Sequence, residues 1–491
     1  MAQPHSASSG TPREKITRRA AAKGFLATFA GGMLLGRNNP AFGADIRTAS
    51  QETIKTEVCV IGGGSGGTGA ALAAARAGAK VVLLERESIL GGTGTCAWVC
   101  AWRPVMGSNG IPRDLYMMMK EDPSGVSCID YSLCGRAGRV KDGKWLPKNP
   151  SLVYEPRTFD YAAREMLEAT GRCQTLLATT FCRARVEGNT IKAVEAWFAG
   201  KRLLIEADVF IDCTADGDVC ADAGCEYHMG EDSKSLYNEP SAPEKAEMSL
   251  NALTLCYRIT DTGVPQKPYL PKDVKSDSCP LSACYDKMPN GDVVINVVGM
   301  IKGNTILCTE HSRLMREAQR RVYAHFHAIQ TQTSGKVQWN TWTISGIAPR
   351  IGVRETRRIL GDYVLTENDC RAGISKQSHK DVIAIADHAI DMHGRRGQHL
   401  RLDGPYGISY RCLLPKGVRN LMIASRAASF SHIAASSCRL QRTMMTLGQA
   451  AGNAAALAVK HHTGPRRVDV AELQARLQSQ GVDIIEPAQK A

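Results

Sequence analysis

The sequence predicts an α/β fold organised around a Rossmann-like dinucleotide-binding unit near the start of the chain. Three observations predict it, namely an apolar run at Val58–Ile61, a G-x-G-x-x-G order at Gly62, Gly64 and Gly67, and a second apolar run at Val81–Leu84 that ends at Glu85. An alanine-rich stretch with helical composition joins the glycines to the second run. A lone G-x-G-x-x-G is weak evidence, but here the flanking strands, the helix and the terminal carboxylate accompany it.

Each part of this unit has a physical role. Gly62 permits a tight turn, Gly64 lets backbone N–H groups approach a pyrophosphate, and Gly67 lets the helix pack closely on the strand. The positive end of the helix faces the phosphates. Glu85, 23 residues after Gly62 (85 − 62), is placed to accept hydrogen bonds from a ribose diol.

The first 44 residues predict an export signal. Thr17-Arg18-Arg19 precedes a mildly apolar segment at 24–36, too short to span a bilayer, and small residues follow at 40–44. This pattern resembles a twin-arginine signal, a receptor-read address for proteins exported already folded. It implies a periplasmic location and makes the twin-arginine export machinery a partner. The alternative is a disordered basic N-terminus.

Composition limits the function classes. The formal net charge is +13, and removing residues 1–44, with six Lys/Arg and one Glu, leaves 13 − 5 = +8, which favours anionic ligands. Basic residues are scattered and no nucleic-acid motif appears, so a nucleic-acid partner is not expected. The 17 cysteines include no C-x-x-C, so no metal site is expected. Local spacing offers three possible cysteine pairs without assigning any of them: Cys128/Cys134, Cys220/Cys225 and Cys279/Cys284.

Hydrophobic periodicity predicts further elements along the chain. Helices are expected at 159–169, 311–329, 382–392 and 439–459, and buried strands at 207–212 and 421–424. Short alternating runs through about Ile205 predict a β-meander. Residues 101–150 are rich in loops and have the composition of an insertion.

Cys96 and Cys100 follow Gly91-Gly92-Thr93 closely. Flavin disulfide reductases place a reactive cysteine pair after a similar Gly-Gly-Thr, so a redox-active Cys96–Cys100 pair is one interpretation. Two extra residues separate Thr93 from Cys96 here, and the spacing of the pair differs from that of the reductases. Two packed cysteines are therefore favoured over a redox-active pair.

Four separated segments together resemble a known family: 62–85 with Gly91-Gly92-Thr93, IDCTADGD at 211–218, VRETRRILGDYVLT at 353–366, and the stretch 410–457 containing GQAAG. They resemble FAD-dependent oxidoreductases of the glutathione-reductase-like superfold, in particular the family with a GxGGG-type N-terminus and a GQAAG-containing last helix. Fumarate reductase flavoproteins are more distant relatives. The resemblance implies an FAD-binding Rossmann-like domain with an interleaved α+β substrate domain.

The implied organisation alternates between the two domains. FAD-binding parts are expected at 52–100, 173–224 and 343–465, substrate regions at 101–172 and 225–342, and a C-terminal tail at 466–491. The resemblance also implies an FAD-contacting set: Gly62, Gly64, Gly67, Glu85, Arg86, Gly92, Thr93, Asp216, Gly217, Arg426, Arg439, Gly448 and Gln449. Of these, Arg426, Arg439 and the backbone around Gly448 and Gln449 are expected to face the ribityl chain and isoalloxazine. The family's usual Met-Pro is Gln441-Arg442 here, which affects the fine geometry of the flavin pocket.

The implied activity is hydride transfer between a small organic substrate and flavin N5, with electrons passed to a quinone, a cytochrome or oxygen. Only one dinucleotide unit is visible, so a built-in NAD(P)H domain is not expected. Two alternatives remain: a thiol–disulfide oxidoreductase using Cys96 and Cys100, and a flavoprotein that only relays electrons.

Hydride transfer needs a group that takes the substrate's proton. The candidates are His432 just before the last helix, His393 in the Asp391-x-His393 pattern, and Tyr410. Each has a structural alternative, because a lone histidine is often a hydrogen-bonded structural residue. Arg350, Arg354 and Arg357 could bind an anionic substrate, although the favoured interpretation is that several of them are solvated or paired with Glu355 and Asp362.

Overall fold

The computed structural model describes residues 51–103, 105–127, 139–141, 144–146, 152–276, 282–332, 338–394 and 399–484. The predicted signal at 1–44 lies outside the described residues. A parallel five-stranded sheet forms the centre of the fold, in the order β23 (Leu421–Ile423), β12 (Val209–Asp212), β2 (Val58–Ile61), β3 (Val81–Leu84) and β8 (Cys173–Leu176). The predicted α/β class with a Rossmann-like parallel sheet is confirmed. β2, β3 and β12 are buried throughout, as strands covered on both faces must be.

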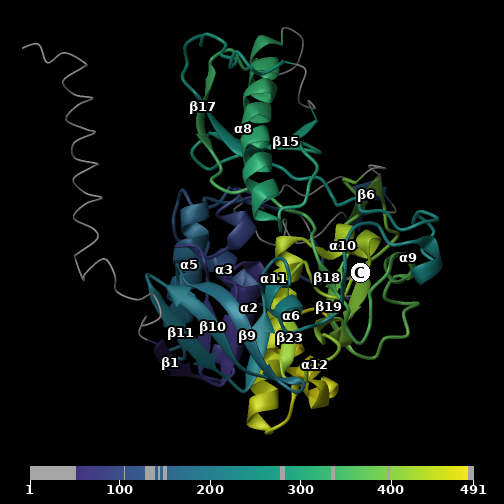
Figure 1. The fold of residues 1–491 in the computed structure, drawn as a ribbon. Coiled ribbons are helices and arrows are strands. Elements are labelled where there is room, and N and C mark those ends of the chain that lie inside the picture. The colour runs from purple at the N-terminus through teal and green to yellow at the C-terminus, as the bar shows by residue number, and fades with distance from the viewer. Residues whose placement is uncertain are drawn as a thin grey trace, which may run out of the picture. The chain divides into compact units, whose positions relative to one another are not determined.

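Two glycine-bearing helices pack tightly together beside this sheet, α2 (Ser65–Arg76) and α11 (Gln441–Lys460) (Figure 1). A Cβ at Gly448 would overlap the carbonyl oxygen of Gly66, and a Cβ at Gly452 would overlap that of Ala70. Glycine lowers helix propensity, so these positions exchange local stability for close helix packing. The predicted helix at 439–459 is confirmed.

The predicted meander consists of β9 (Thr180–Glu187), β10 (Thr190–Phe198) and β11 (Lys201–Glu206), paired antiparallel, and β1 (Gln51–Lys55) adds to the sheet beside β11. A second four-stranded sheet has the order β15 (Ala283–Lys287), β16 (Val293–Val297), β14 (Tyr257–Asp261) and β17 (Trp342–Ile347). The long helix α8 (Cys308–Thr331) packs against β17 (Figure 1). This helix contains the predicted segment 311–329.

Smaller elements complete the fold. The remaining helices are α3 (Ile111–Met119), α5 (Pro156–Glu168), α6 (Asp218–Asp222), α7 (Lys234–Tyr237), α9 (Glu367–Ala372), α10 (His432–Cys438) and α12 (Val470–Ser479), with 3₁₀ turns η2 (Gly92–Gly94), η3 (Tyr410–Leu413) and η4 (Pro465–Arg467). The two-stranded pairs are β4 (Ala101–Trp102) with β7 (Leu152–Val153), β5 (Arg139–Lys141) with β6 (Lys144–Leu146), β13 (Tyr227–His228) with β18 (Arg358–Ile359), β19 (Val382–Ala386) with β22 (Tyr406–Ser409), and β20 (Ile390–Asp391) with β21 (His399–Leu400). No helix in these described ranges is long and apolar enough to cross a membrane.

The predicted helix at 382–392 is wrong. Residues 382–386 form β19, paired antiparallel with β22, and 390–391 form β20. The run Val382-Ile383-Ala384-Ile385-Ala386 is buried on both faces, so its continuous apolar pattern fits a covered strand as well as a helix. Periodicity alone does not separate the two for so short a run.

Candidate active site

A cavity of about 1430 Å³ opens beside the carboxyl ends of β2 and β12, where open α/β sheets bind their ligands. Its walls come from the parallel sheet, the meander, the second four-stranded sheet and the start of α11. Pockets for drug-sized ligands reach roughly 1,000 Å³, so this cavity has room for a larger ligand with a small one beside it. We define a glycine end by Gly62, Gly64, Glu85 and Gly92, and an arginine end by Arg354, Asp391, His393 and Arg439.

The glycine end is built from backbone. Gly62 has φ +100°, and a Cβ there would lie 2.6 Å from the carbonyl oxygen of Cys213. A Cβ at Gly67 would overlap the carbonyl oxygen of Gly62. Gly64 is different, because its nearest neighbour is the Cα of Gly92 at 3.9 Å. Gly62 and Gly67 are therefore required by the turn itself, whereas Gly64 keeps open space in front of the loop.

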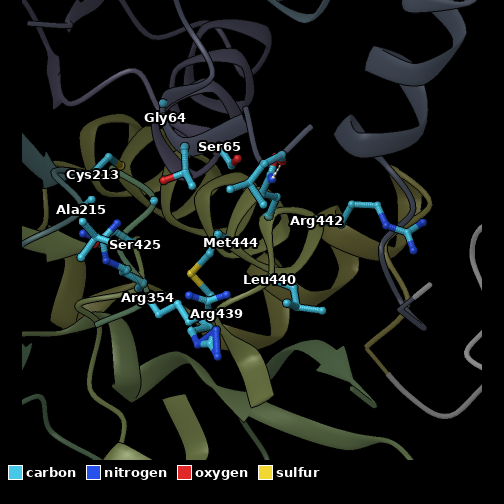
Figure 2. Close-up of a pocket in the computed structure, with 18 of the residues that line it drawn as sticks. Gly64, Ser65, Cys213, Ala215, Arg354, Ser425, Arg439, Leu440, Arg442 and Met444 are labelled. Atoms are coloured by element: carbon cyan, nitrogen blue, oxygen red, sulfur yellow. Dashed lines mark hydrogen bonds between the residues drawn. The ribbon is translucent and has the colours of Figure 1, made fainter. Parts of the chain in front are cut away.

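The N-terminus of α2 points into that space (Figure 2). Its N-cap residue is Gly64, no side chain caps it, and its first turn contains no acidic residue. The first amides of a helix lack partners within the helix and carry partial positive charge, so an uncapped N-terminus suits an anionic phosphate.

Glu85 closes the other side of this end and is 5% exposed. Its carboxylate accepts hydrogen bonds from the amides of Gly63 (2.6 Å) and Glu87 (2.8 Å). Burial raises the pKa of Glu85, and these two amides oppose the rise. The fixed carboxylate retains lone pairs for a diol at the mouth of the loop.

Further predicted positions line the same cavity. Arg86, Gly92 and Thr93 lie on its wall, as do Asp216 and Arg426. The Arg426 guanidinium donates to Asp216 Oδ1 (2.6 Å), and Thr356 Oγ1 also donates to that oxygen (2.6 Å). Gly217, with φ +66°, precedes α6 and does not line the cavity. Tight backbone, an uncapped helix N-terminus and a fixed carboxylate together fit the adenosine and pyrophosphate part of FAD.

Besides Gly217, three predicted FAD contacts do not line the cavity: Gly67, which packs against Gly62 inside the turn, and Gly448 and Gln449. Gly448 packs in the interface of α11 with α2, and Gln449 accepts from the amide of Ile111 (3.0 Å) and donates to Gln480 (2.8 Å). Neither residue lines the cavity; instead the first turn of α11 does, through Gln441, Arg442 and Met444. The N-terminus of α11 faces the cavity, but the GQAAG segment lies further along the helix, where Gly448 packs against α2.

At the arginine end, Arg354 and Arg439 lie on one wall near Met444 (Figure 2). Arg354 donates to the carbonyl oxygen of Ala252 (2.7 Å), and Arg439 to the carbonyl oxygen of Asp391 (2.9 Å). Burial and the nearby Arg354 lower the pKa of Arg439 to about 10. Burial also lowers the pKa of Arg354. Two cations close together in a poorly solvated wall create a site for an anion.

His393 and Asp391 complete this end. The two side chains approach to 2.8 Å between His393 Nε2 and Asp391 Oδ2. Burial lowers the pKa of His393, and the positive charges of Arg354 and Arg439 lower it further. The hydrogen bond to Asp391 opposes this change. The neutral imidazole is therefore favoured at pH 7, the form that accepts a proton.

The other two catalytic candidates lie off the cavity wall. His432 is 2% exposed, and its Nδ1 lies 2.8 Å from Glu355 Oε1. Tyr410 is also buried, and its hydroxyl donates to the carbonyl oxygen of Pro465 (2.8 Å). Burial holds the pKa of Tyr410 far above its ordinary value. The structure thus brings only His393 of the three predicted candidates to the cavity.

Of the three arginines suggested for an anionic substrate, two are paired with carboxylates and one is not. Arg350 lies 3.4 Å from Glu87 and Arg357 lies 2.9 Å from Asp218, so both are paired. The expected carboxylate partners were wrong, since Glu355 pairs with Arg358 and Asp362 pairs with Arg466. Among the described residues, Arg354 has no carboxylate within ion-pair distance.

Cys96 and Cys100 are both buried and neither lines the cavity. Burial raises the pKa of Cys96 to about 11 and that of Cys100 further. All described cysteines are free thiols, including Cys220 and Cys225; Cys128, Cys134 and Cys279 lie outside the described residues. Packed cysteines fit these surroundings better than a reactive pair.

Sequence reasoning missed several other residues that line the cavity. Trp98 lines the cavity with a positive φ of 53°, and its ring packs where a side chain at Gly346 would lie. Arg103 and Asp286 form a two-fold hydrogen-bonded pair (2.9 and 3.0 Å) across 183 residues. His388 also lines the cavity, and burial lowers its pKa to about 4. No local sequence pattern predicts these contacts, and the positive φ of Trp98 can be recognised only in the structure.

A buried network behind the wall was missed as well. Asn251 Oδ1 accepts from the His393 amide (2.7 Å), and Asn251 Nδ2 donates to Glu355 Oε2 (2.9 Å). Glu355 also accepts from Arg358 and lies against His432. Burial raises the pKa of Glu355, but the nearby His432 and Arg358 outweigh this and hold it at about 2. His432 thus supports the loop that presents His393.

The profile of the FAD-dependent oxidoreductase family matches residues 57–477 of the chain. Solved structures with a similar fold include a geranylgeranyl bacteriochlorophyll reductase-like protein from Thermoplasma acidophilum (13% identity, 88% of this chain and 83% of that one, TM-score 0.41). They also include p-nitrophenol 4-monooxygenase PnpA from Pseudomonas putida DLL-E4 (12% identity, 89% and 92%, TM-score 0.44) and the flavin-dependent brominase Bmp2 (10% identity, 87% and 83%, TM-score 0.43). None of the curated proteins matches the chain.

Proposed function

The chain belongs to the FAD-dependent oxidoreductase family, and on that premise we propose that it is an exported enzyme that oxidises a small organic substrate. Bound FAD supplies the two-electron acceptor for such a reaction. The observation that carries the proposal is the pairing of His393 with Asp391 on the wall that also holds Arg354 and Arg439. This wall offers a proton acceptor next to a site for charge.

His393 acts as the general base in this proposal. It accepts the proton of the substrate's hydroxyl or amino group at the same carbon that loses its hydride. Asp391 holds the His393 imidazole in one orientation through the 2.8 Å contact, and Asn251 accepts a hydrogen bond from the backbone amide of His393. A positioned base contributes about 10²- to 10⁴-fold to such a step.

We further propose that the chain works in the periplasm and passes its electrons to a quinone, a cytochrome or oxygen. The twin-arginine-like Thr17-Arg18-Arg19 segment supports export, because that route carries proteins that have already loaded their cofactor. The single dinucleotide unit in the sequence supports an organic donor rather than NADPH.

The test is an anaerobic screen of the FAD-loaded protein against alcohols, sugars, amino acids and hydroxy acids. Reduction of the flavin is monitored by its visible absorbance. The expected result is bleaching by at least one organic donor and none by NADPH alone. His393→Asn should slow the bleaching by about 100-fold or more while FAD stays bound. His311→Asn on α8, away from the cavity wall, serves as the control. Steady reduction by NADPH, or an unchanged rate in His393→Asn, would contradict the proposal.

A further inference from the structure

The charges around Arg354 and Arg439 do not balance. Each guanidinium donates to one backbone carbonyl, of Ala252 and Asp391 respectively, and the Arg439 Nε has no hydrogen-bond partner among the described residues. In the described part of the chain, no carboxylate lies within ion-pair distance of either guanidinium. Both residues line the cavity, and an arginine has five N–H donors, so each guanidinium keeps donors for a ligand there.

The neighbouring acids are already engaged. Glu355 is held by Arg358, His432 and Asn251, and Asp286 by Arg103. Asp391 is an acid close enough to act on both guanidiniums; its carboxylate is bonded to His393 and lies 3.5 Å from His399 Nδ1. With His393 neutral, two cations and one carboxylate leave an excess positive charge at this end. An uncompensated buried charge is costly, so the site favours a ligand that brings a negative charge.

We propose that the substrate carries a carboxylate and that Arg354 and Arg439 bind it together. This inference rests on the proposed function and names the substrate class for the same site. A planar guanidinium matches the two oxygens of a carboxylate, and two guanidiniums meeting at one wall fix its orientation as well as its charge. The carboxylate then sits beside His393, so the oxidisable carbon of an organic acid lies within reach of the base.

FAD does not account for this charge. Its pyrophosphate would be held at the glycine end by the uncapped N-terminus of α2. The N-terminus of α11, whose N-cap residue Leu440 offers no capping side chain, would suit the negative charge of a reduced isoalloxazine. The two guanidiniums remain for a second ligand.

The test measures binding without turnover, so it can fail separately from the proposed function. FAD-loaded protein is titrated with acetate and benzoate, and with acetamide and benzamide as neutral matches, while the visible spectrum of the bound flavin reports occupancy. The acids should perturb the spectrum and the amides should not at tenfold higher concentration. Arg354→Gln and Arg439→Gln should each weaken acid binding by about 10- to 100-fold.

Arg320→Gln is the matched control, since Arg320 lies on the exposed face of α8 and pairs with Asp273. FAD content is measured in every variant. Equal binding of acids and amides, or unchanged acid binding in both cavity variants, would overturn the inference. Loss of FAD from Arg354→Gln or Arg439→Gln would also overturn it, because the arginines would then hold the cofactor. Failure of every donor to bleach the flavin, with acid binding intact, would instead remove the proposed function.

Discussion

The two ends of the cavity are built in different ways. The glycine end uses backbone: Gly62 and Gly67 have no room for a Cβ, and the helix N-terminus at Gly64 offers unpaired amides. The arginine end uses side chains of Arg354, Asp391, His393 and Arg439 from three separate segments. The first arrangement recognises a feature common to all dinucleotides, whereas the second can change its substrate without disturbing the fold.

The largest expected effect is at Gly67. Gly67→Ala places a methyl group against the carbonyl oxygen of Gly62 inside the turn, so we expect little folded protein and loss of more than nine-tenths of the bound FAD. Gly404→Ala is the control. Gly404 lines the cavity, and a Cβ there meets open space, so this variant should keep its FAD content. Flavin-to-protein ratio and circular dichroism check both variants; a normal FAD content in Gly67→Ala would show that the turn is not needed.

Glu355→Gln should weaken the scaffold behind the arginine end. The pKa of Glu355 lies at about 2 in the folded protein, below its ordinary 4.5, so its stabilising contribution is complete above pH 4.5 and is lost as the pH falls towards 2. A difference of this size corresponds to about 3 kcal/mol. Urea unfolding between pH 7 and pH 3 should show a less stable variant at pH 7 and a shallower loss of stability on acidification. An equally steep loss in the variant would exclude Glu355 as the titrating group.

Asp391→Asn should move the pH dependence of flavin reduction. The pKa of His393 is lowered below its ordinary 6.5, so the rate should rise with pH through a midpoint below 6.5. The charge of Asp391 opposes that lowering, so removing the charge should shift the midpoint to still lower pH. The amide oxygen of the new asparagine can keep the hydrogen bond, so the imidazole should stay in place. The measurement is the anaerobic reduction rate from pH 4 to pH 8. A shift of the midpoint to higher pH would mean that the ionisation of a group other than His393 controls the rise of the reduction rate.

The smallest effect is expected at Cys96, which belongs to neither end. Cys96→Ser should change the reduction rate by less than about two-fold, because the buried thiol keeps a raised pKa and supplies no thiolate at pH 7. A long-wavelength thiolate-to-flavin band in the reduced wild type, absent from Cys96→Ser, would favour the thiol–disulfide alternative instead.

The glycine end could be predicted from the sequence because its parts are contiguous. Gly62, Gly64, Gly67 and Glu85 lie within one strand–turn–helix–strand unit, where local backbone requirements decide the residue types. The arginine end could not be assembled in this way. Arg354 and Arg439 are 85 residues apart (439 − 354), and only the packing of the intervening chain brings them to one wall.

The errors have similar physical causes. His432 is a candidate in the sequence because it lies just before the last helix, but its imidazole faces Glu355 in the interior. The resemblance implies a flavin contact for Gly448 within the GQAAG segment; in the structure this glycine instead permits the close approach of Gly66 on α2. A sequence shows that space is required at such a position, but the tertiary fold decides what occupies it.

The most direct test of the division between the two ends is the FAD affinity of Gly64→Ala. Gly64 has an ordinary extended backbone (φ −69°, ψ −169°), and its nearest neighbour to a new Cβ is 3.9 Å away, so the fold should accept the methyl group. We predict an unchanged unfolding midpoint without added FAD and an FAD dissociation constant raised at least tenfold, because the methyl group occupies the space for the pyrophosphate. An unchanged dissociation constant would contradict the placement of FAD at the glycine end.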